Sequence, residues 1–183
     1  MIVYNGYMED IRIETARLTL RPLGTGDLAT THAYASDAEN TKYMMFLPNE
    51  SVVETRVFLE ECENQWQSPQ PEQYEFAILL NGVHIGAVSL YFENGPEVCE
   101  LGWVLAAPYH GHGYATEAAR AAMAFARDRL CVRRFIAHCD AENLASQGVM
   151  RKLGMVLTDD SGTRKNRGSD EVRRELRYEV IVD

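Results

Sequence analysis

The sequence has no long apolar run and only four cysteines. No stretch approaches the roughly 18 consecutive apolar residues that a transmembrane helix needs. The first ten residues, MIVYNGYMED, lack the basic segment and apolar core of a secretory signal. Cys62, Cys99, Cys131 and Cys139 show no C-x-x-C spacing and no partner histidines spaced for zinc. We therefore expect a cytoplasmic protein with free thiols, no metal site and no membrane contact.

Positive charge is also scarce. Lys and Arg number 18 against 27 Asp and Glu, a net charge of -9, which argues against binding to a nucleic-acid backbone. The acidic balance suits a cationic acceptor such as an amine, although an acidic soluble surface needs no such role. The 183 residues suit one domain. We expect an N-terminal arm at 1–10 and a domain at 11–183.

The first third of the chain shows one strand and two helices. Arg17–Arg21 alternates polar and apolar residues at period 2, which predicts a strand. Thr25 or Asp27 can cap a helix that ends near Ser36. Ser51-Val52-Val53-Glu54 has the form of a capping box and predicts a helix through about Trp66. The expected buried stripe of this second helix is Val53, Val57, Phe58, Cys62 and Trp66.

The middle of the chain predicts an antiparallel meander. Asn81-Gly82 separates two apolar runs, Tyr74–Leu80 and Val83–Phe92, and an Asn-Gly pair in this position is a strong hairpin signal. Asn94-Gly95-Pro96 predicts a second turn, which leads to a strand at Cys99–Leu105.

The remaining part predicts a βαβ unit and a final hairpin. An alanine-rich helix, Tyr114–Leu130, separates the Cys99–Leu105 strand from a strand at Arg133–Asp140, so the two strands should be parallel neighbours. Asn143 can cap a further helix that stops at Gly154. The last pair of strands is expected at Met155–Thr158 and Glu171–Val182, joined by a polar, mobile loop at 161–170.

The most informative stretch is Cys99–Glu117, in which a strand runs into His110-Gly111-His112-Gly113-Tyr114-Ala115 and then into a helix. Glycines let a backbone approach an anion, and the first amides of a helix point at it. A dinucleotide fingerprint would need a third glycine near Thr116, and a P-loop would need Gly-Lys-Ser/Thr. Two interpretations remain open: a site for the diphosphate of another nucleotide cofactor, or only a tight turn.

The segment YHGHGYATEA resembles the acetyl-CoA signature Gln/Arg-x-x-Gly-x-Gly/Ala of the GNAT superfamily of N-acetyltransferases. His110 takes its first position, Gly113 its glycine and Ala115 its last position. Three further blocks, ETARLTLRPL, ELGWVL and ENLASQGVMRKLGM, match in order and spacing the branch that resembles the ribosomal-protein N-terminal acetyltransferases. The resemblance covers about residues 14 to 180.

The resemblance implies a single-domain α/β (α+β) fold with a mixed, mostly antiparallel sheet of about seven strands and about four flanking helices. The central parallel strands should splay apart around acetyl-CoA. Pantetheine would contact the backbone of Trp103, Val104 and Leu105, and also Asn143. The residues implied for the diphosphate are His110, Gly111, His112, Gly113, Tyr114 and Ala115.

His110 departs from the family's Gln or Arg at the first signature position. Because an imidazole gains charge below neutral pH, we expect acetyl-CoA to bind more tightly as the pH falls toward 6.

The resemblance also implies catalytic roles. Glu100 would accept the amine proton directly or through a water, with its pKa raised by burial. An exposed carboxylate on the polar face of the strand is the alternative. Ser146 would protonate the coenzyme A thiolate, and a backbone N–H near Val104 would bind the carbonyl oxygen. Met150 stands where many relatives carry a tyrosine acid, and methionine cannot donate a proton.

The expected function is transfer of acetyl from acetyl-CoA to a primary amine, by direct attack in a ternary complex. The acceptor is a protein N-terminus or a small amine, and a homodimer is plausible. The alternative is a catalytically silent, coenzyme A-binding regulatory or partner-binding module.

Four histidines are expected to be structural or solvated rather than catalytic: His32, His84, His112 and His138. The basic residues of the last loop, Arg164, Lys165 and Arg167, either neutralise a phosphate or an anionic substrate group or form a solvated hairpin tip. The apolar segment Tyr43–Pro48 either lines the acceptor pocket or fills core between the first two helices.

Overall fold

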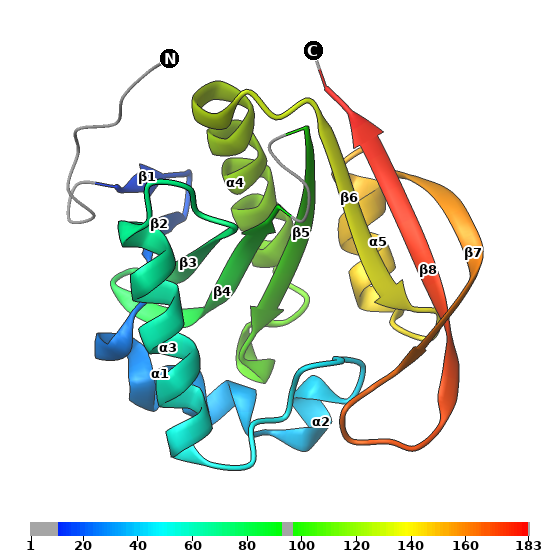
Figure 1. Cartoon of the computed structure of the whole chain (residues 1–183), viewed down its shortest axis with the longest axis horizontal. Coiled ribbons are helices and arrows are strands. Elements are labelled where there is room, and N and C mark those ends of the chain that lie inside the picture. The colour runs from blue at the N-terminus through cyan, green and yellow to red at the C-terminus, as the bar shows by residue number, and fades with distance from the viewer. Residues whose placement is uncertain (1–10, 93–96, 183) are drawn as a thin grey trace.

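One mixed sheet organises the molecule. The computed structural model describes residues 11–92 and 97–182, and in them eight strands lie in the order β1-β2-β3-β4-β5-β6-β8-β7 (Figure 1). Neighbours are antiparallel except β5 and β6, which are parallel. The strands are β1 Ile13–Glu14, β2 Leu18–Pro22, β3 Gln73–Leu80, β4 Val83–Tyr91, β5 Val98–Leu105, β6 Arg134–Asp140, β7 Val156–Lys165 and β8 Val172–Ile181. The mixed, mostly antiparallel sheet is confirmed. It exceeds the expected strand count because Ile13–Glu14 pairs separately with β2.

Helices cover both faces of the sheet. The α-helices of residues 11–92 and 97–182 are α1 Leu28–Ala35, α2 Ala38–Thr41, α3 Val52–Gln67, α4 Tyr114–Leu130 and α5 Leu144–Lys152. Leu59 of α3 packs with Ala77 and Ala87 on one face. The alanines of α4 pack on the other face, in the cluster that holds Cys99 and Leu101. Helices α1 and α3 thus lie on one side and α4 and α5 on the other (Figure 1).

The turn chemistry agrees with the predictions. Asn81 and Gly82 have φ values of 50° and 81°, as a type I′ hairpin turn requires. Gly154 ends the last helix segment with φ 83°. The predicted turn at Asn94-Gly95-Pro96 and the arm at 1–10 lie outside the described residues.

The buried face of α3 agrees with the prediction at Cys62 and Trp66 but differs from it elsewhere. Thr55, Leu59, Cys62 and Trp66 are buried, whereas Val53 and Val57 are 64% and 59% exposed and Phe58 is exposed as well. Ser51 caps the helix as expected, because its side chain accepts the Glu54 amide. Thr55 can be buried since its hydroxyl is paired. It accepts a hydrogen bond from Asn49 Nδ2 at 2.8 Å and lies 2.9 Å from His32 Nδ1.

The last hairpin is more ordered than the polar loop that we expected at 161–170. Strand β7 continues to Lys165. Arg164, whose side chain is 8% exposed, donates to Glu175 and to the Tyr43 carbonyl, both at 3.2 Å. Arg167 donates to the Phe46 carbonyl and pairs with Glu54. These two arginines are therefore not a solvated hairpin tip; they tie the hairpin to the segment at 43–46.

The segment Tyr43–Pro48 is not core. Phe46 is 79% exposed, and Met45 is exposed as well. The expectation of core packing is therefore wrong for this segment, and a role beside the acceptor pocket stays a prediction.

Candidate active site

Strands β5 and β6 separate in the middle of the sheet. Within the described residues they pair only from Val98↔Arg134 to Glu100↔Ile136, while β5 continues to pair with β4 as far as Leu105. Past Glu100, one edge of β5 therefore faces a gap. Backbone groups on such an edge need hydrogen-bond partners from elsewhere, and a ligand can supply them.

The direction of the backbone shows which groups face the gap. The amide of Ala106 donates to the carbonyl of Ile85, the residue before Gly86 on β4, over 2.9 Å. Backbone groups alternate in direction along a strand, so those of Val104 also point toward β4. Those of Trp103 and Leu105 point toward the gap. A carbonyl-binding amide near Val104 stays a prediction, and the strand direction restricts it to the amide of Trp103 or Leu105.

Gly86 allows the end of β5 to approach β4 closely. A Cβ atom at this position would lie 2.2 Å from the carbonyl oxygen of Val104 and 2.8 Å from Cα of Leu105. Any larger residue would push the end of β5 away, so this glycine helps to set the width of the gap.

His110 is held by the protein itself. Its Nε2 lies 2.9 Å from the carbonyl oxygen of Leu105, which also accepts a hydrogen bond from Asn40 Nδ2 at 3.1 Å. Because a carbonyl can only accept, Nε2 carries the proton and Nδ1 is the ring atom left for a ligand. A contact from His110 to the cofactor stays a prediction, restricted to Nδ1.

The glycine turn leads directly into α4. Gly111 and Gly113 have φ values of 79° and 81°, a region that favours glycine. Gly113 is the N-cap residue of α4. Because glycine has no side chain, it offers no side-chain acceptor to the first amides of the helix. The N–H groups of Tyr114, Ala115 and Thr116 therefore have no side-chain cap, and their binding of the cofactor diphosphate stays a prediction.

Arg17 and Glu117 fasten this turn to the start of β2. Glu117 accepts hydrogen bonds from Thr15 Oγ1 at 2.6 Å and Arg17 Nε at 2.7 Å, and Arg17 Nη1 donates to the His112 carbonyl at 3.0 Å. Burial opposes ionisation of Glu117, but the hydrogen bonds from Thr15 and Arg17 outweigh it and lower its pKa. The Arg17 guanidinium also lies 4.6 Å from the centre of the Tyr114 ring, which stacks loosely with His112.

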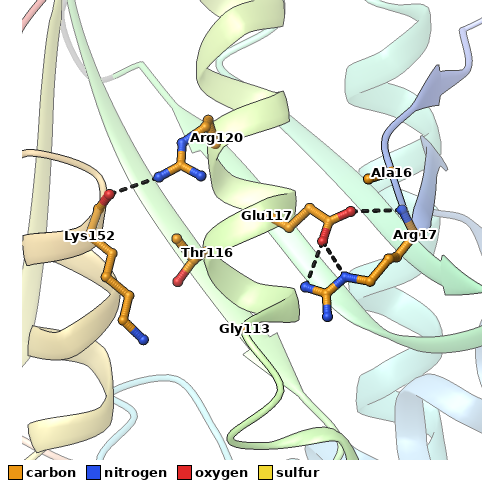
Figure 2. A pocket seen from close by; sticks show the side chains of 7 residues that line it. All are labelled: Ala16, Arg17, Gly113, Thr116, Glu117, Arg120 and Lys152. Atoms are coloured by element: carbon orange, nitrogen blue, oxygen red, sulfur yellow. Dashed lines mark hydrogen bonds and ion pairs between the residues drawn. The ribbon is translucent and has the colours of Figure 1, made fainter.

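A cavity of about 540 Å³ opens beside the N-terminus of α4 (Figure 2). Its lining residues are Ala16, Arg17, Gly113, Thr116, Glu117, Arg120 and Lys152. Arg120 of α4 donates to the Lys152 carbonyl of α5 over 2.8 Å, so two cationic side chains from neighbouring helices reach the same space. Glu117 is already paired with Arg17, which leaves Arg120 and Lys152 as the positive charge available to an anion.

Glu100 lies on the face of the sheet that carries α1 and α3. It shares this face with Val104, which packs against the Leu59 cluster. Its side chain is 30% exposed, less buried than we expected, and Oε1 lies 2.9 Å from Nδ1 of His138 on β6. The hydrogen bond to Glu100 is the largest contribution that raises the pKa of His138 above 6.5.

Trp103 and Ser146 lie on the opposite face. Trp103 Nε1 donates to Ser146 Oγ over 3.1 Å, and Asn143 Oδ1 accepts the Ser146 amide at 3.0 Å as the N-cap of α5. The indole bond uses a lone pair of the serine oxygen and not its proton. The cap occupies Asn143 Oδ1, so a contact from this side chain to pantetheine would use its NH₂ group. Met150 is fully buried in the core.

The structure thus brings the expected site residues to one gap, but on two sides of it. Ser146, Asn143 and the glycine turn lie on the α4–α5 side, and Glu100 lies on the other. Sequence patterns missed the cations Arg17, Arg120 and Lys152, whose position depends on how the helices pack. His138 could have been predicted from the sequence, because the expected parallel pairing of β5 with β6 places it on the same face of the sheet as Glu100.

The cysteines contribute no nucleophile to the site. All four are free thiols. Burial raises the pKa of Cys99 to about 12 and that of Cys139 to about 11, and it raises the pKa of Cys62 further. Cys131 caps the far end of α4, about 25 Å from the glycine turn at 1.5 Å per residue.

The described part of the chain holds neither a candidate metal cluster nor a candidate membrane-spanning helix. No cluster of three or more His, Cys, Asp or Glu side chains in residues 11–92 and 97–182 could hold a metal ion. In the same ranges no helix has the length and apolar character needed to cross a membrane.

Known proteins match this chain over most of its length. A family model described as an acetyltransferase (GNAT) domain matches residues 17–156. The chain is similar to the uncharacterized N-acetyltransferase YnaD of Bacillus subtilis (strain 168), with 30% identity over 149 residues, 79% of this chain and 82% of YnaD. It is also similar to a GNAT-family acetyltransferase structure from Bacillus anthracis, with a TM-score of 0.80, 26% identity, and coverage of 93% of this chain and 98% of that one.

A further similar structure is RimL, a ribosomal L7/L12 alpha-N-protein acetyltransferase in complex with coenzyme A. Its TM-score is 0.83 at 19% identity, covering 94% of this chain and 99% of that one. At this identity the likeness shows a shared fold. The family match and YnaD show more: this chain belongs to the GNAT family and is an N-acetyltransferase.

Proposed function

We propose that this enzyme transfers acetyl from acetyl-CoA to a primary amine by direct attack, with both substrates bound at once. The separation of β5 from β6 carries the proposal, because it exposes backbone groups on one strand edge directly before the glycine turn. The two sides of this gap carry different chemistry, as transfer between two substrates requires.

The α4–α5 side fits acetyl-CoA. The amides at the start of α4 suit the diphosphate, and Arg120 and Lys152 add positive charge beside them. The gap-facing amide and carbonyl of Trp103 and the amide of Leu105 suit the amides of pantetheine, whereas the Leu105 carbonyl is already bonded to His110 and Asn40. RimL, which shares the fold, is described in complex with coenzyme A.

The other side fits the acceptor amine. His138 and Asp140 follow Glu100 on the same face, toward the end of β6. Asp140 is buried and accepts hydrogen bonds from Arg173 and Asn166. A cavity of about 300 Å³ opens at this end, lined by Ala38, Lys42, Tyr43, Pro48, Glu142, Asn166, Gly168, Ser169 and Arg173. We propose that the acceptor reaches Glu100 from this cavity.

The chemistry needs a base, an oxygen-binding donor and an acid. Acetyl-CoA supplies a thioester carbonyl, at which a C–N bond forms while the C–S bond breaks. Glu100 takes the proton of the attacking amine, directly or through a water. An amide of Trp103 or Leu105 donates to the carbonyl oxygen as negative charge develops there. Ser146 gives its hydroxyl proton to the departing thiolate.

Direct transfer agrees with the state of the cysteines. Burial keeps the thiols of Cys62, Cys99 and Cys139 protonated at neutral pH, and a protonated thiol is a poor nucleophile. Cys131 lies at the C-terminal end of α4, away from the glycine turn at its N-terminal end.

The acceptor is a protein N-terminus or a small amine such as a polyamine, an aminoglycoside or an amino-acid derivative. RimL is described as acting on an alpha-amino group of a ribosomal protein. We further propose a cytoplasmic enzyme, in keeping with its free thiols, that has no nucleic-acid substrate and can form a homodimer.

The test measures thiol release from acetyl-CoA with a panel of amines and N-terminal peptides, alongside calorimetric binding of coenzyme A. Acceptor-dependent thiol release supports the proposal. Tight binding without such release would instead favour the silent coenzyme A-binding module. In the active enzyme, Glu100→Gln should abolish turnover with binding intact, and near-normal turnover of that variant would remove Glu100 as the base.

A further inference from the structure

The ion pair between Glu100 and His138 links the two strands at the point where they begin to separate. Glu100 and Ile136 form the last residue pair between β5 and β6, and His138 is two residues further along β6 on the same face. Residues this far apart in the sequence, with a separation of 38, meet only because of the sheet register. Both side chains keep access to solvent, at 30% and 26% exposure.

The geometry divides the two oxygens of Glu100 between two tasks. His138 Nδ1 lies 2.9 Å from Oε1. A carboxylate accepts only, so Nδ1 donates the hydrogen bond. Oε1 is thus held by the imidazole, and Oε2 remains for the acceptor amine or for a water that bridges to it.

We propose that His138 is a positioning residue for Glu100, and that its charge controls how well Glu100 accepts the proton of the acceptor amine. This inference rests on the proposed acetyl transfer and adds a regulator to the same site. In the active form His138 is neutral, and its Nδ1–H orients the carboxylate. When Nε2 also gains a proton, the imidazolium stabilises the ionised carboxylate and makes it a weaker base.

The surroundings of His138 set the pH range of this control. Glu100 faces it from β5, and Glu175 and Arg177 face it from β8, where Arg177 is its direct cross-strand neighbour. The hydrogen bond to Glu100 raises the pKa of His138 most; burial and Arg177 lower it, and Glu175 raises it. The net effect is a raised pKa, so the inhibitory imidazolium persists closer to neutral pH than for an ordinary histidine.

The first experiment follows the His138 ring by NMR as the pH is varied, in the unaltered protein and in Glu100→Gln. The proposal expects the titration midpoint of His138 to fall in the variant, because the carboxylate that stabilises the imidazolium is gone. An unchanged midpoint would show that the two groups are not coupled and would overturn the proposal.

The second experiment compares kcat/KM at pH 6 to 9, with an N-terminal serine peptide and spermidine as probes. His138→Gln keeps a neutral donor but cannot be charged, whereas His138→Leu has neither property. Below the His138 pKa, the neutral fraction of His138 shrinks as the pH falls. The kcat/KM of His138→Gln divided by that of the unaltered protein should therefore rise by up to tenfold for each unit by which the pH falls. At high pH, His138→Gln should approach the unaltered rate and His138→Leu should remain at least tenfold lower.

The pH dependence that comes from ionisation of the acceptor amine is the same for both proteins, so it cancels in this ratio of kcat/KM values. A ratio that is flat with pH, or equal activity of the Gln and Leu variants, would overturn the role of His138 while leaving acetyl transfer intact. No turnover by the unaltered protein would overturn both proposals. His32→Gln is the matched control, because it removes an imidazole bonded to Thr55 on α3 and should leave the pH profile unchanged. Acetyl-CoA binding by each variant reports that it is folded.

Discussion

The indole nitrogen of Trp103 donates a hydrogen bond to the hydroxyl oxygen of Ser146, which joins β5 to α5 across the gap between β5 and β6. The bond fixes the position of the serine oxygen and leaves its proton for another acceptor. A second contact, from the Ser146 amide to Asn143 Oδ1, fixes the backbone of the same residue. Ser146 is therefore oriented from two sides by contacts within the protein.

Ser146→Ala should lower kcat by about 100-fold with little change in the KM for acetyl-CoA, since a positioned general acid contributes at least this much. Steady-state thiol release measures both constants. Ser161→Ala is the matched control, because Ser161 is exposed on β7 and bonds only locally to Asp159. Equal kcat in Ser146→Ala and the control would mean that the thiolate leaves without a proton from this residue.

Gly113→Ala should weaken coenzyme A binding and cost about 1–2 kcal/mol of unfolding free energy, because an L-residue is strained at φ 81°. Gly148→Ala offers a matched comparison within helix α5, where a new Cβ meets no atom within 4 Å. That variant should gain about 0.5–1 kcal/mol, since alanine suits a helix interior better than glycine. Urea unfolding and calorimetry measure the two effects. The same change in stability for both variants would contradict the conformational role of Gly113.

Local patterns predict the elements near the site well. Helix α4 runs from Tyr114 to Leu130 as the sequence indicates, because a glycine N-cap and an alanine face are both local features. The parallel pairing of β5 with β6 follows from the intervening helix. The splayed edge at Trp103 and Leu105 came from the family resemblance, and the structure adds the direction in which each backbone group points.

What sequence patterns cannot supply is the pairing of side chains from distant segments. The Glu100–His138 contact and the Arg120–Lys152 contact depend on strand register and on helix packing. The face of α3 is a second case. Val53 and Val57 are apolar but exposed, and the helix instead turns Leu59 toward the alanines of β3 and β4, beside the correctly predicted Cys62.

Leu59→Ala should therefore destabilise the protein by about 2–5 kcal/mol, as expected for a buried leucine that leaves a cavity. Val57→Ala, on the exposed face of the same helix, should change stability by less than about 0.5 kcal/mol. Denaturant unfolding of both variants compares the two faces directly. A larger loss of unfolding free energy in Val57→Ala than in Leu59→Ala would support the buried stripe that the sequence predicts, which includes Val57.

The buried carboxyl group of Glu75 should make the stability of the protein depend on pH. Its carboxyl group is 2% exposed and accepts hydrogen bonds from Ser89 Oγ at 2.6 Å and Tyr91 Oη at 2.5 Å. Burial raises its pKa above 4.5, and the two hydrogen bonds only partly offset this. The folded state therefore holds the proton more tightly than the unfolded state. The resulting stability is complete below pH 4.5 and is lost as the pH rises through the folded pKa.

Glu75→Gln removes this ionisation while keeping the size of the side chain, and the rotatable hydroxyls of Ser89 and Tyr91 can still pair with an amide. The unfolding free energy of the variant should rise relative to the unaltered protein between pH 5 and 8, as measured by urea denaturation. Glu72→Gln is the control for the substitution itself, because Glu72 is exposed in the same segment. A difference for Glu75→Gln that is constant with pH would mean that Glu75 titrates alike in both states. The hydrogen bonds from Ser89 and Tyr91 would then fully compensate its burial.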